Sequence, residues 1–199
     1  MQIDIDLLYA WGAITKKYKR NDIIFHEDSR ASCYFQIITG KVKMYNSNEE
    51  GKRFTQGIFD DGCCFGEPPL FINETYPASA EAVEDSIIIK LGKDKFLKII
   101  DEYPKIQREF LNDLAHKVFV KSVTAKSIIN QKPEFRITAF FNSLKKNNQN
   151  STTKLIIPFT RQEIADFTGL RVETVIRQLK EMEKNNIVNI IHHKVYYIK

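Results

Sequence analysis

The stretch FTRQEIADFTGLRVETVIRQLKEMEK, from Phe159 to Lys184, decides how the rest of the chain is interpreted. Apolar residues recur in it at helical spacing, with one interruption near Gly169, and this pattern predicts two short helices that share one buried wedge. The apolar residues are Ile164, Phe167, Leu170, Val175, Leu179 and Met182. Two such helices joined by a tight turn form a helix-turn-helix.

Signals at the ends of both helices support this interpretation. Thr160 is a suitable N-cap, and Glu163, three residues later, completes a capping box. Gly169 stands where the turn requires a residue that tolerates positive φ. A second helix that begins near Arg171 or Val172 carries a polar face, and polar side chains near the start of such a helix reach base edges in a major groove. An ordinary amphipathic hairpin with solvated charges is the alternative.

The distribution of charge agrees with a nucleic-acid partner. From residue 130 onward, 12 Lys and Arg residues stand against 6 Asp and Glu residues, whereas residues 1–129 carry a net charge of −1. A local positive excess attracts a polyanion at long range, although a simple solubility face would have the same composition. No apolar run approaches the ~18 residues of a membrane span, and no basic region precedes the apolar N-terminus. We therefore expect a cytoplasmic protein without membrane contact.

The first half of the chain has the pattern of a β-sandwich or jelly roll. Residues 22–91 contain short segments rich in β-branched and aromatic residues, separated by turn-forming residues. The glycines expected at turns are Gly40, Gly51, Gly57, Gly62 and Gly66. A leading helix is predicted over Ile3–Tyr18.

Beyond Lys93 the periodicity becomes helical. A short helix stops or kinks at Pro104, and residues 105–130 then predict one long helix without Pro or Gly. Residues 131–133 break it and provide a hinge. Another helix, a short strand and the helix-turn-helix follow, and residues 187–198 predict a β-hairpin.

The sequence TRQEIADFTGL, followed two residues later by ETVIRQLKEME, resembles the DNA-binding end of the cyclic-AMP receptor protein / fumarate-nitrate regulator family. The segments YFQIITGKV, from Tyr34 to Val42, and FGE, from Phe65 to Glu67, resemble the effector-binding barrel of that family. The resemblance covers most of the chain and implies an α+β protein with three parts. They are a β jelly-roll barrel with flanking helices over 1–104, a dimerisation helix and hinge over 105–132, and a winged helix-turn-helix over 133–199.

The same resemblance implies a homodimeric transcriptional regulator whose partners are a near-palindromic double-stranded DNA operator and RNA polymerase. It assigns base reading to Arg171, Val172, Glu173 and Arg177. Phosphate contacts are expected from Thr160, Arg161, Gln162, Thr174, Lys180, His193 and Lys194. A Glu can accept from cytosine N4 and an Arg can bind guanine O6 and N7, but Val172 replaces the family's third reader, an Arg, and can only press on a thymine methyl. In a symmetric dimer, the corresponding helix of the other copy would read the other half-site.

The long helix carries the expected dimer stripe, which consists of Phe110, Leu114, Val118 and Ala125. In the family this helix packs on its own copy in the manner of a coiled coil. The alternative is a long helix that packs only on its own barrel.

The expected effector pocket consists of Phe65, Gly66, Glu67, Pro68, Tyr76, Pro77 and Ala78. Family members that bind a cyclic nucleotide close this cassette with Arg, then Ser or Thr, then Ala. Here Tyr76 replaces the Arg and Pro77 replaces the Ser or Thr, which removes a charge-assisted contact to the phosphate and one backbone donor. We predict that the barrel does not bind cyclic AMP or cyclic GMP tightly, and the effector is not identified.

Cysteine and histidine positions limit the possible cofactors. Cys33, Cys63 and Cys64 have neither a disulfide framework nor metal-ligand spacing, so structural thiols are expected, with redox sensing at Cys63 or Cys64 as the alternative. No cysteine precedes Cys33, so the iron–sulfur sensor of oxygen-responsive relatives is absent, whereas His26 or His116 could ligate haem.

No catalytic triad, phosphate-cradling glycine loop or metal spacing supports an enzyme. The competing class of function is a small-molecule or cyclic-nucleotide binding module that acts through protein partners.

Overall fold

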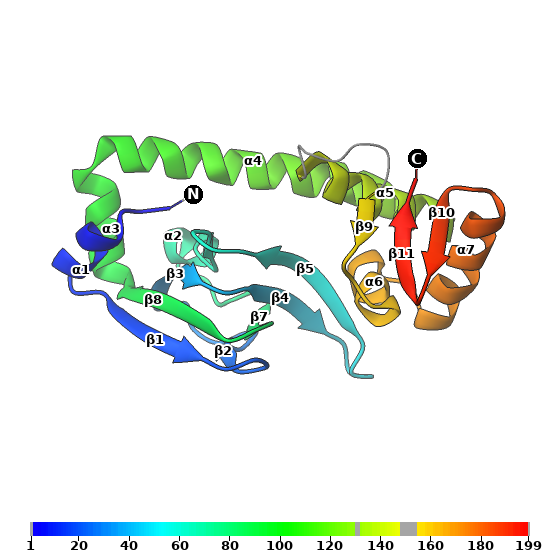
Figure 1. Ribbon diagram of the computed structural model, residues 1–199. Helices are drawn as coiled ribbons and strands as arrows, with labels where there is room; N and C mark the ends of the chain where they lie inside the picture. The colour runs from blue at the N-terminus through cyan, green and yellow to red at the C-terminus, as the bar shows by residue number, and fades with distance from the viewer. Residues whose placement is uncertain (1, 130–131, 148–154, 199) are drawn as a thin grey trace. The chain divides into compact units, whose positions relative to one another are not determined.

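The computed structural model describes residues 2–129, 132–147 and 155–198, and the chain divides into two compact units, Met1–Val118 and Phe119–Lys199. Each unit has its own hydrophobic core and is described separately (Figure 1). In the described residues, no helix is both long enough and apolar enough to cross a membrane.

The first unit is a β-sandwich with flanking helices (Figure 1). One sheet has the strand order β1-β8-β3-β6 and the other has the order β2-β7-β4-β5, and the pairs within both sheets are antiparallel. Its elements are α1 (Ile5–Ala10), β1 (Ile14–Tyr18), β2 (Ile23–Phe25), β3 (Cys33–Thr39), β4 (Val42–Ser47), β5 (Arg53–Phe59), β6 (Cys64–Phe65), α2 (Pro68–Ile72), β7 (Ser79–Ala82), β8 (Ser86–Gly92), α3 (Lys93–Glu102) and the part of α4 (Pro104–Ile129) up to Val118. The predicted α+β fold with an N-terminal jelly-roll barrel is confirmed.

Two expectations for the first unit were wrong. The leading helix ends at Ala10, and residues 14–18 form β1 because they pair with β8 from Ile14 opposite Lys90 to Tyr18 opposite Ser86. Gly57 lies inside β5, beside a register shift in its pairing with β4, and does not form a turn. The other four glycines expected at turns have positive φ.

The long helix α4 packs partly on the barrel of its own chain. The ring of Phe110 is only 2% exposed and contacts Phe96 edge-on at a centroid distance of 5.3 Å and Tyr34 at 6.0 Å. The expectation that Phe110 belongs to the dimer stripe is therefore corrected, because burial in its own core removes this side chain from any second copy. Leu114 is half-buried, Val118 is exposed, and the side chain of Ala125 lies outside the described residues.

The second unit is a winged helix-turn-helix, which confirms the predicted C-terminal fold (Figure 1). Its further elements are α5 (Pro133–Asn147), β9 (Leu155–Ile157), α6 (Arg161–Thr168), α7 (Val172–Lys184), β10 (Val188–Ile191) and β11 (Lys194–Tyr197). The strands form one sheet in the order β10-β11-β9, and β10 and β11 make the predicted hairpin. Apolar residues of α5, α6, α7 and all three strands form its core.

Candidate nucleic-acid interface and effector pocket

The turn between α6 and α7 has the local geometry that the sequence predicts. The Thr160 hydroxyl accepts from the backbone N–H of Glu163 at 3.2 Å, and the Glu163 carboxylate accepts from the backbone N–H of Thr160 at 2.7 Å. This reciprocal capping box satisfies two N–H groups at the start of α6. Gly169 ends α6 at φ 66°, and its N–H donates to the carbonyl of Ala165. Both local expectations are confirmed.

Helix α7 separates an apolar face from a solvent-facing one. Val175, Leu179 and Met182 are buried in the core of the second unit. Because a helix turns by about 100° per residue, the positions three and four residues apart on the opposite side share one face. The exposed residues of that face are Glu173, Ile176, Arg177 and Lys180.

The side chains of the predicted base readers differ in their exposure. Arg171, Glu173 and Arg177 are exposed, as a role in base reading requires. Val172 is half-buried and packs against the core of the second unit, so only part of its side chain faces solvent, and its assignment to base reading stays a prediction. Ile176 is exposed too, and helical spacing from Glu173 places it on the same face. It was not among the predicted base readers, because an apolar side chain gives no sequence signal of a DNA contact.

Two predicted phosphate-contacting side chains already have partners within the chain. The Arg161 guanidinium donates to the backbone carbonyl of His193 at 2.9 Å, and burial lowers its pKa. The Gln162 amide donates to Asp166 at 2.8 Å. Arg161 therefore joins the start of α6 to the turn of the β10–β11 hairpin, which is the wing of the fold.

The other predicted phosphate contacts lie at or near the surface of the second unit. The Thr160 hydroxyl is used in the cap, and Thr174 is half-buried. Lys180, His193 and Lys194 are exposed. Their assignment to phosphate stays a prediction.

Side-chain hydrogen bonds hold the wing to α7 and to α5. The Glu183 carboxylate accepts from the N–H of Ile190 at 2.9 Å, which joins α7 to β10. His192 and His193 turn the hairpin with positive φ values of 46° and 65°. A phenol hydrogen bond at 2.8 Å from Tyr197 to Asn142 ties β11 to α5. The first of these bonds joins the wing to α7, and the last joins it to α5.

The predicted effector pocket is filled by aromatic side chains. The Tyr76 ring stacks on Phe25 with a centroid distance of 3.8 Å and an interplanar angle of 14°, and its hydroxyl donates to the carbonyl of Cys33 at 3.2 Å. Burial raises the pKa of Tyr76 to about 12. Gly66 has φ 72°, and a Cβ there would lie 2.8 Å from the Phe25 ring, so the chain passes close to this stack. Tyr76 thus occupies space next to the FGE segment.

The remaining residues of the predicted pocket do not share one environment. Phe65 and Ala78 are fully buried, whereas Pro68 and Pro77 are exposed. The carbonyl of Pro77 accepts from the amide of Asn46 at 2.6 Å. The structure therefore places Tyr76 beside Gly66 and leaves Pro68 and Pro77 at the surface.

Glu67 is only 1% exposed and is paired with a lysine of the long helix. The Lys117 ammonium lies 2.5 Å from the Glu67 carboxylate and 2.9 Å from that of Asp113, one turn earlier on α4. Burial, the largest single effect, lowers the pKa of Lys117, but the charges of Glu67 and Cys64 and the hydrogen bonds to Asp113 and Glu67 together outweigh it, so the pKa is raised. Burial is the largest effect on Asp113 and raises its pKa, but the hydrogen bond and the charge of Lys117, together with smaller contributions, outweigh burial, so the pKa is lowered. The role of Lys117 could not be expected from the sequence, because no local signal links residues 50 positions apart.

The same cluster contains the buried thiol Cys64. Burial, together with the charge of Glu67, raises its pKa to about 12. A thiol that stays protonated at neutral pH is a poor nucleophile, which disfavours redox sensing at Cys64. Cys64, Glu67 and Asp113 place potential metal-ligand atoms within 4.8 Å of one another, but the Lys117 ammonium lies among these groups and supplies the positive charge itself.

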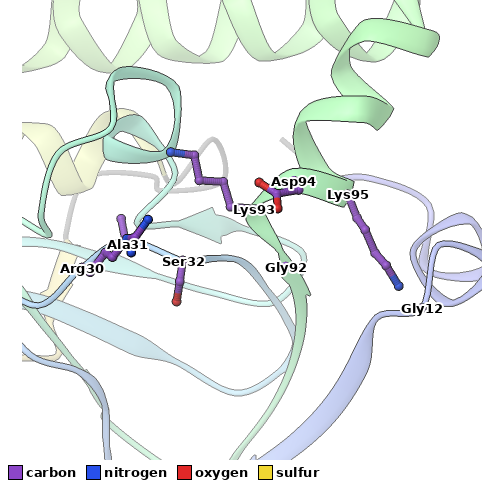
Figure 2. A pocket seen from close by; sticks show the side chains of 8 residues that line it. All are labelled: Gly12, Arg30, Ala31, Ser32, Gly92, Lys93, Asp94 and Lys95. Atoms are coloured by element: carbon purple, nitrogen blue, oxygen red, sulfur yellow. The ribbon is translucent and has the colours of Figure 1, made fainter.

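Two surface hollows in the described part of the chain are lined by other residues. The larger, of about 520 Å³, is lined by Gly12, Arg30, Ala31, Ser32, Gly92, Lys93, Asp94 and Lys95 (Figure 2). In Figure 2 the side chains of Lys93 and Lys95 point away from each other, and the Lys93 ammonium donates to Asn73. The hollow does not concentrate positive charge on one point. The haem candidates His26 and His116 are both exposed.

Comparisons with known proteins agree with this geometry. A cyclic nucleotide-binding domain family matches residues 15–103, and a Crp-like helix-turn-helix domain family matches residues 136–199. The chain is 22% identical over 179 residues to the nitrogen fixation regulation protein FixK of Bradyrhizobium diazoefficiens, a match that covers 88% of this chain and 74% of FixK. It is 26% identical over 176 residues to the cAMP-activated global transcriptional regulator CRP of Salmonella typhimurium, covering 87% and 84%.

Among solved structures, the c-di-GMP responsive global regulator CLP of Xanthomonas campestris superimposes with a TM-score of 0.84. The match covers 98% of each chain at 16% sequence identity. At this identity the likeness shows a shared fold.

Proposed function

Because the chain belongs to the cyclic-AMP receptor protein / fumarate-nitrate regulator family of DNA-binding transcriptional regulators, we propose that it acts as a homodimer on a near-palindromic DNA site. The observation that carries the proposal is the solvent face of α7. Within the described residues, the side chains of Glu173, Arg177 and Lys180 make no hydrogen bond or ion pair, although each is charged and exposed. Such a face is suited to base edges and phosphates.

Glu173 and Arg177 would read bases, and Lys180, His193 and Lys194 would contact phosphate. A carboxylate accepts from cytosine N4 and a guanidinium donates to guanine O6 and N7. Arg161 has a different role in this proposal from that expected, because its bond to the His193 carbonyl positions the wing tip. The wing tip then contacts the DNA backbone at a fixed distance from the bases that α7 reads.

A second copy would pack against the exposed apolar face of α4. Leu111 and Val118, seven residues apart, are 67% and 65% exposed, and Ala115 between them is exposed too. Residues at this spacing form the seam of a coiled-coil pair. Phe110, one position from Leu111, instead faces the barrel core. One side of α4 therefore packs on its own barrel, and the other would pack on a second copy.

The effector of this barrel is proposed to be something other than a cyclic nucleotide. Two observations support this: Tyr76 is stacked on Phe25 where the family places its phosphate-binding Arg, and Glu67 is already paired with Lys117. A ribose hydroxyl would have to displace a charge-assisted bond of 2.5 Å from a buried carboxylate.

The DNA-binding proposal is tested by fluorescence anisotropy with a duplex obtained by selection from random sequences. We expect an enriched near-palindromic site, binding by a dimer in native mass spectrometry, and affinity that falls steeply with salt because phosphate contacts release counterions. Leu111→Glu combined with Val118→Glu should yield a monomer with weak site binding. A monomeric wild-type chain that retains no duplex at low salt contradicts the proposal.

The effector proposal is tested separately by isothermal titration calorimetry with cyclic AMP and cyclic GMP. We expect no saturable heat at micromolar nucleotide. Micromolar binding of either nucleotide contradicts it, and leaves the DNA-binding proposal intact.

A further inference from the structure

An exposed isoleucine lies in the middle of the charged face of α7. The Ile176 side chain is 42% exposed, and it lies three residues after Glu173 and four before Lys180. At about 100° per residue, these positions fall on one side of the helix. The three apolar residues of α7 that stabilise the fold are buried on the other side, so Ile176 is not needed for the core.

Thymine is the base whose chemistry suits such a residue. In the major groove it presents a C5-methyl group, while the other edges present donors and acceptors that an aliphatic side chain cannot satisfy. A branched aliphatic side chain that is already exposed gains from burial against a methyl and loses no hydrogen bond. Facing cytosine or guanine, the same side chain would leave polar edges without partners.

The neighbouring valine is a weaker candidate for this contact. Val172 lies one turn before Ile176 on α7, but it is half-buried and packs on the core of the second unit. Its remaining surface is smaller, and its position is fixed by packing. Ile176 therefore has the larger free apolar surface on the face that carries Glu173 and Arg177.

We propose that Ile176 is a specificity-determining residue that contacts the C5-methyl group of one thymine in each half-site. This inference rests on the proposed function, because it requires α7 to enter the major groove. It places an apolar reader between a carboxylate that accepts hydrogen bonds and a guanidinium that donates them.

The test uses deoxyuridine, which pairs as thymine does and lacks only the methyl group. A site is first selected from random duplexes with the full-length dimer, and each thymine is then replaced by deoxyuridine at the symmetric positions of both half-sites. Binding is measured by anisotropy at constant salt. We expect one thymine position at which wild-type affinity falls roughly fourfold per half-site, as loss of one buried methyl predicts.

The matched variant is Ile176→Ala, which should bind the thymine and deoxyuridine duplexes at that position equally well. Ile72→Ala is the control, because Ile72 is 67% exposed on α2 of the first unit and should leave the preference unchanged. If Ile176→Ala and the wild type lose the same affinity at every replaced position, or no position is sensitive, the inference is overturned. A selection that enriches no sequence overturns the proposed function as well.

Discussion

The interior of the barrel and the solvent face of α7 use charged side chains in opposite ways. In the barrel, Glu67 is 1% exposed and its carboxylate is bound at 2.5 Å by Lys117 of the same chain. On α7, Glu173 and Arg177 are exposed, and in the described residues their side chains have no ion-pair partner. Charged side chains thus have partners within the chain in the barrel, whereas on α7 they remain available to a partner outside it.

The difference follows from the cost of burying charge. A carboxylate removed from water is strongly destabilising unless an opposite charge satisfies it, so the barrel must contain its own cation. An exposed charge is solvated and costs little until a partner with complementary groups replaces the water. The barrel therefore binds part of its own long helix, while α7 keeps its charges exposed, as the proposed contact with DNA requires.

The largest expected effect comes from removing the internal cation. Lys117→Ala leaves Glu67 buried without its partner and should destabilise the first unit by about 3 kcal/mol, the lower end for a broken buried pair because Lys117 is partly exposed. The single tryptophan, Trp11, packs on the core of this unit, so its fluorescence during urea unfolding reports the change.

Two further variants show whether the pair itself is responsible. In a Glu67→Gln background, Lys117→Ala should cost much less, because no charge remains uncompensated. Lys105→Ala, at an exposed lysine on the same helix, should have almost no effect. Equal losses from Lys117→Ala in both backgrounds would show that packing, rather than charge, is what matters.

On the solvent face of α7, Arg177→Ala should weaken binding to the selected DNA site by ~1–3 kcal/mol and hardly change binding to random DNA. Lys194→Ala, at the exposed wing tip, should weaken both by a similar factor, because a phosphate contact carries no sequence information. The two affinities are measured by anisotropy at one salt concentration. An Arg177→Ala variant that loses both equally would reassign Arg177 to phosphate.

Removing the capping box tests whether the start of α6 depends on the hydrogen bonds between Thr160 and Glu163. Thr160→Ala removes the acceptor for the Glu163 N–H and should destabilise the start of α6 by ~1 kcal/mol. Amide hydrogen exchange should become faster at Glu163 and its neighbours in the first turn. Lys180→Ala, at an exposed residue of α7, is the control. Unchanged exchange in Thr160→Ala would show that the start of α6 is held by the core of the second unit alone.

The smallest effect is expected at the buried thiol. Because burial raises the pKa of Cys64 to about 12, iodoacetamide at pH 8 should label it far more slowly than the partly exposed Cys33 and Cys63, as peptide mass spectrometry can measure. Labelling of Cys64 as fast as Cys63 would restore the redox alternative.

The same raised pKa has a consequence for alkaline stability. The folded chain keeps a proton that the unfolded chain loses near the ordinary pKa of 9.0, so the contribution is complete below about pH 9 and is lost toward pH 12. Cys64→Ser should reduce the fall in unfolding free energy over that interval. An unchanged slope would mean that other groups cause it.

Structural features with a local cause could be predicted from the sequence. The reciprocal bonds of Thr160 and Glu163 join residues three positions apart, and Gly169 ends its helix because one glycine tolerates positive φ. Features with a distant cause could not: residues 14–18 form a strand because β8, roughly seventy positions later, pairs with them. Phe110 was assigned to a dimer surface because its spacing alone does not reveal which face of α4 meets the barrel.

The amino-acid sequence by itself determined the order of barrel, long helix and winged helix-turn-helix, since periodicity, caps and turn residues act within a few positions. The substitution of Tyr76 for an arginine could be read there too. Tertiary structure alone decided that this tyrosine stacks on Phe25 and that Lys117 reaches Glu67, 50 positions away. Such contacts depend on which distant segments the folded chain brings together, and burial then gives them their strength.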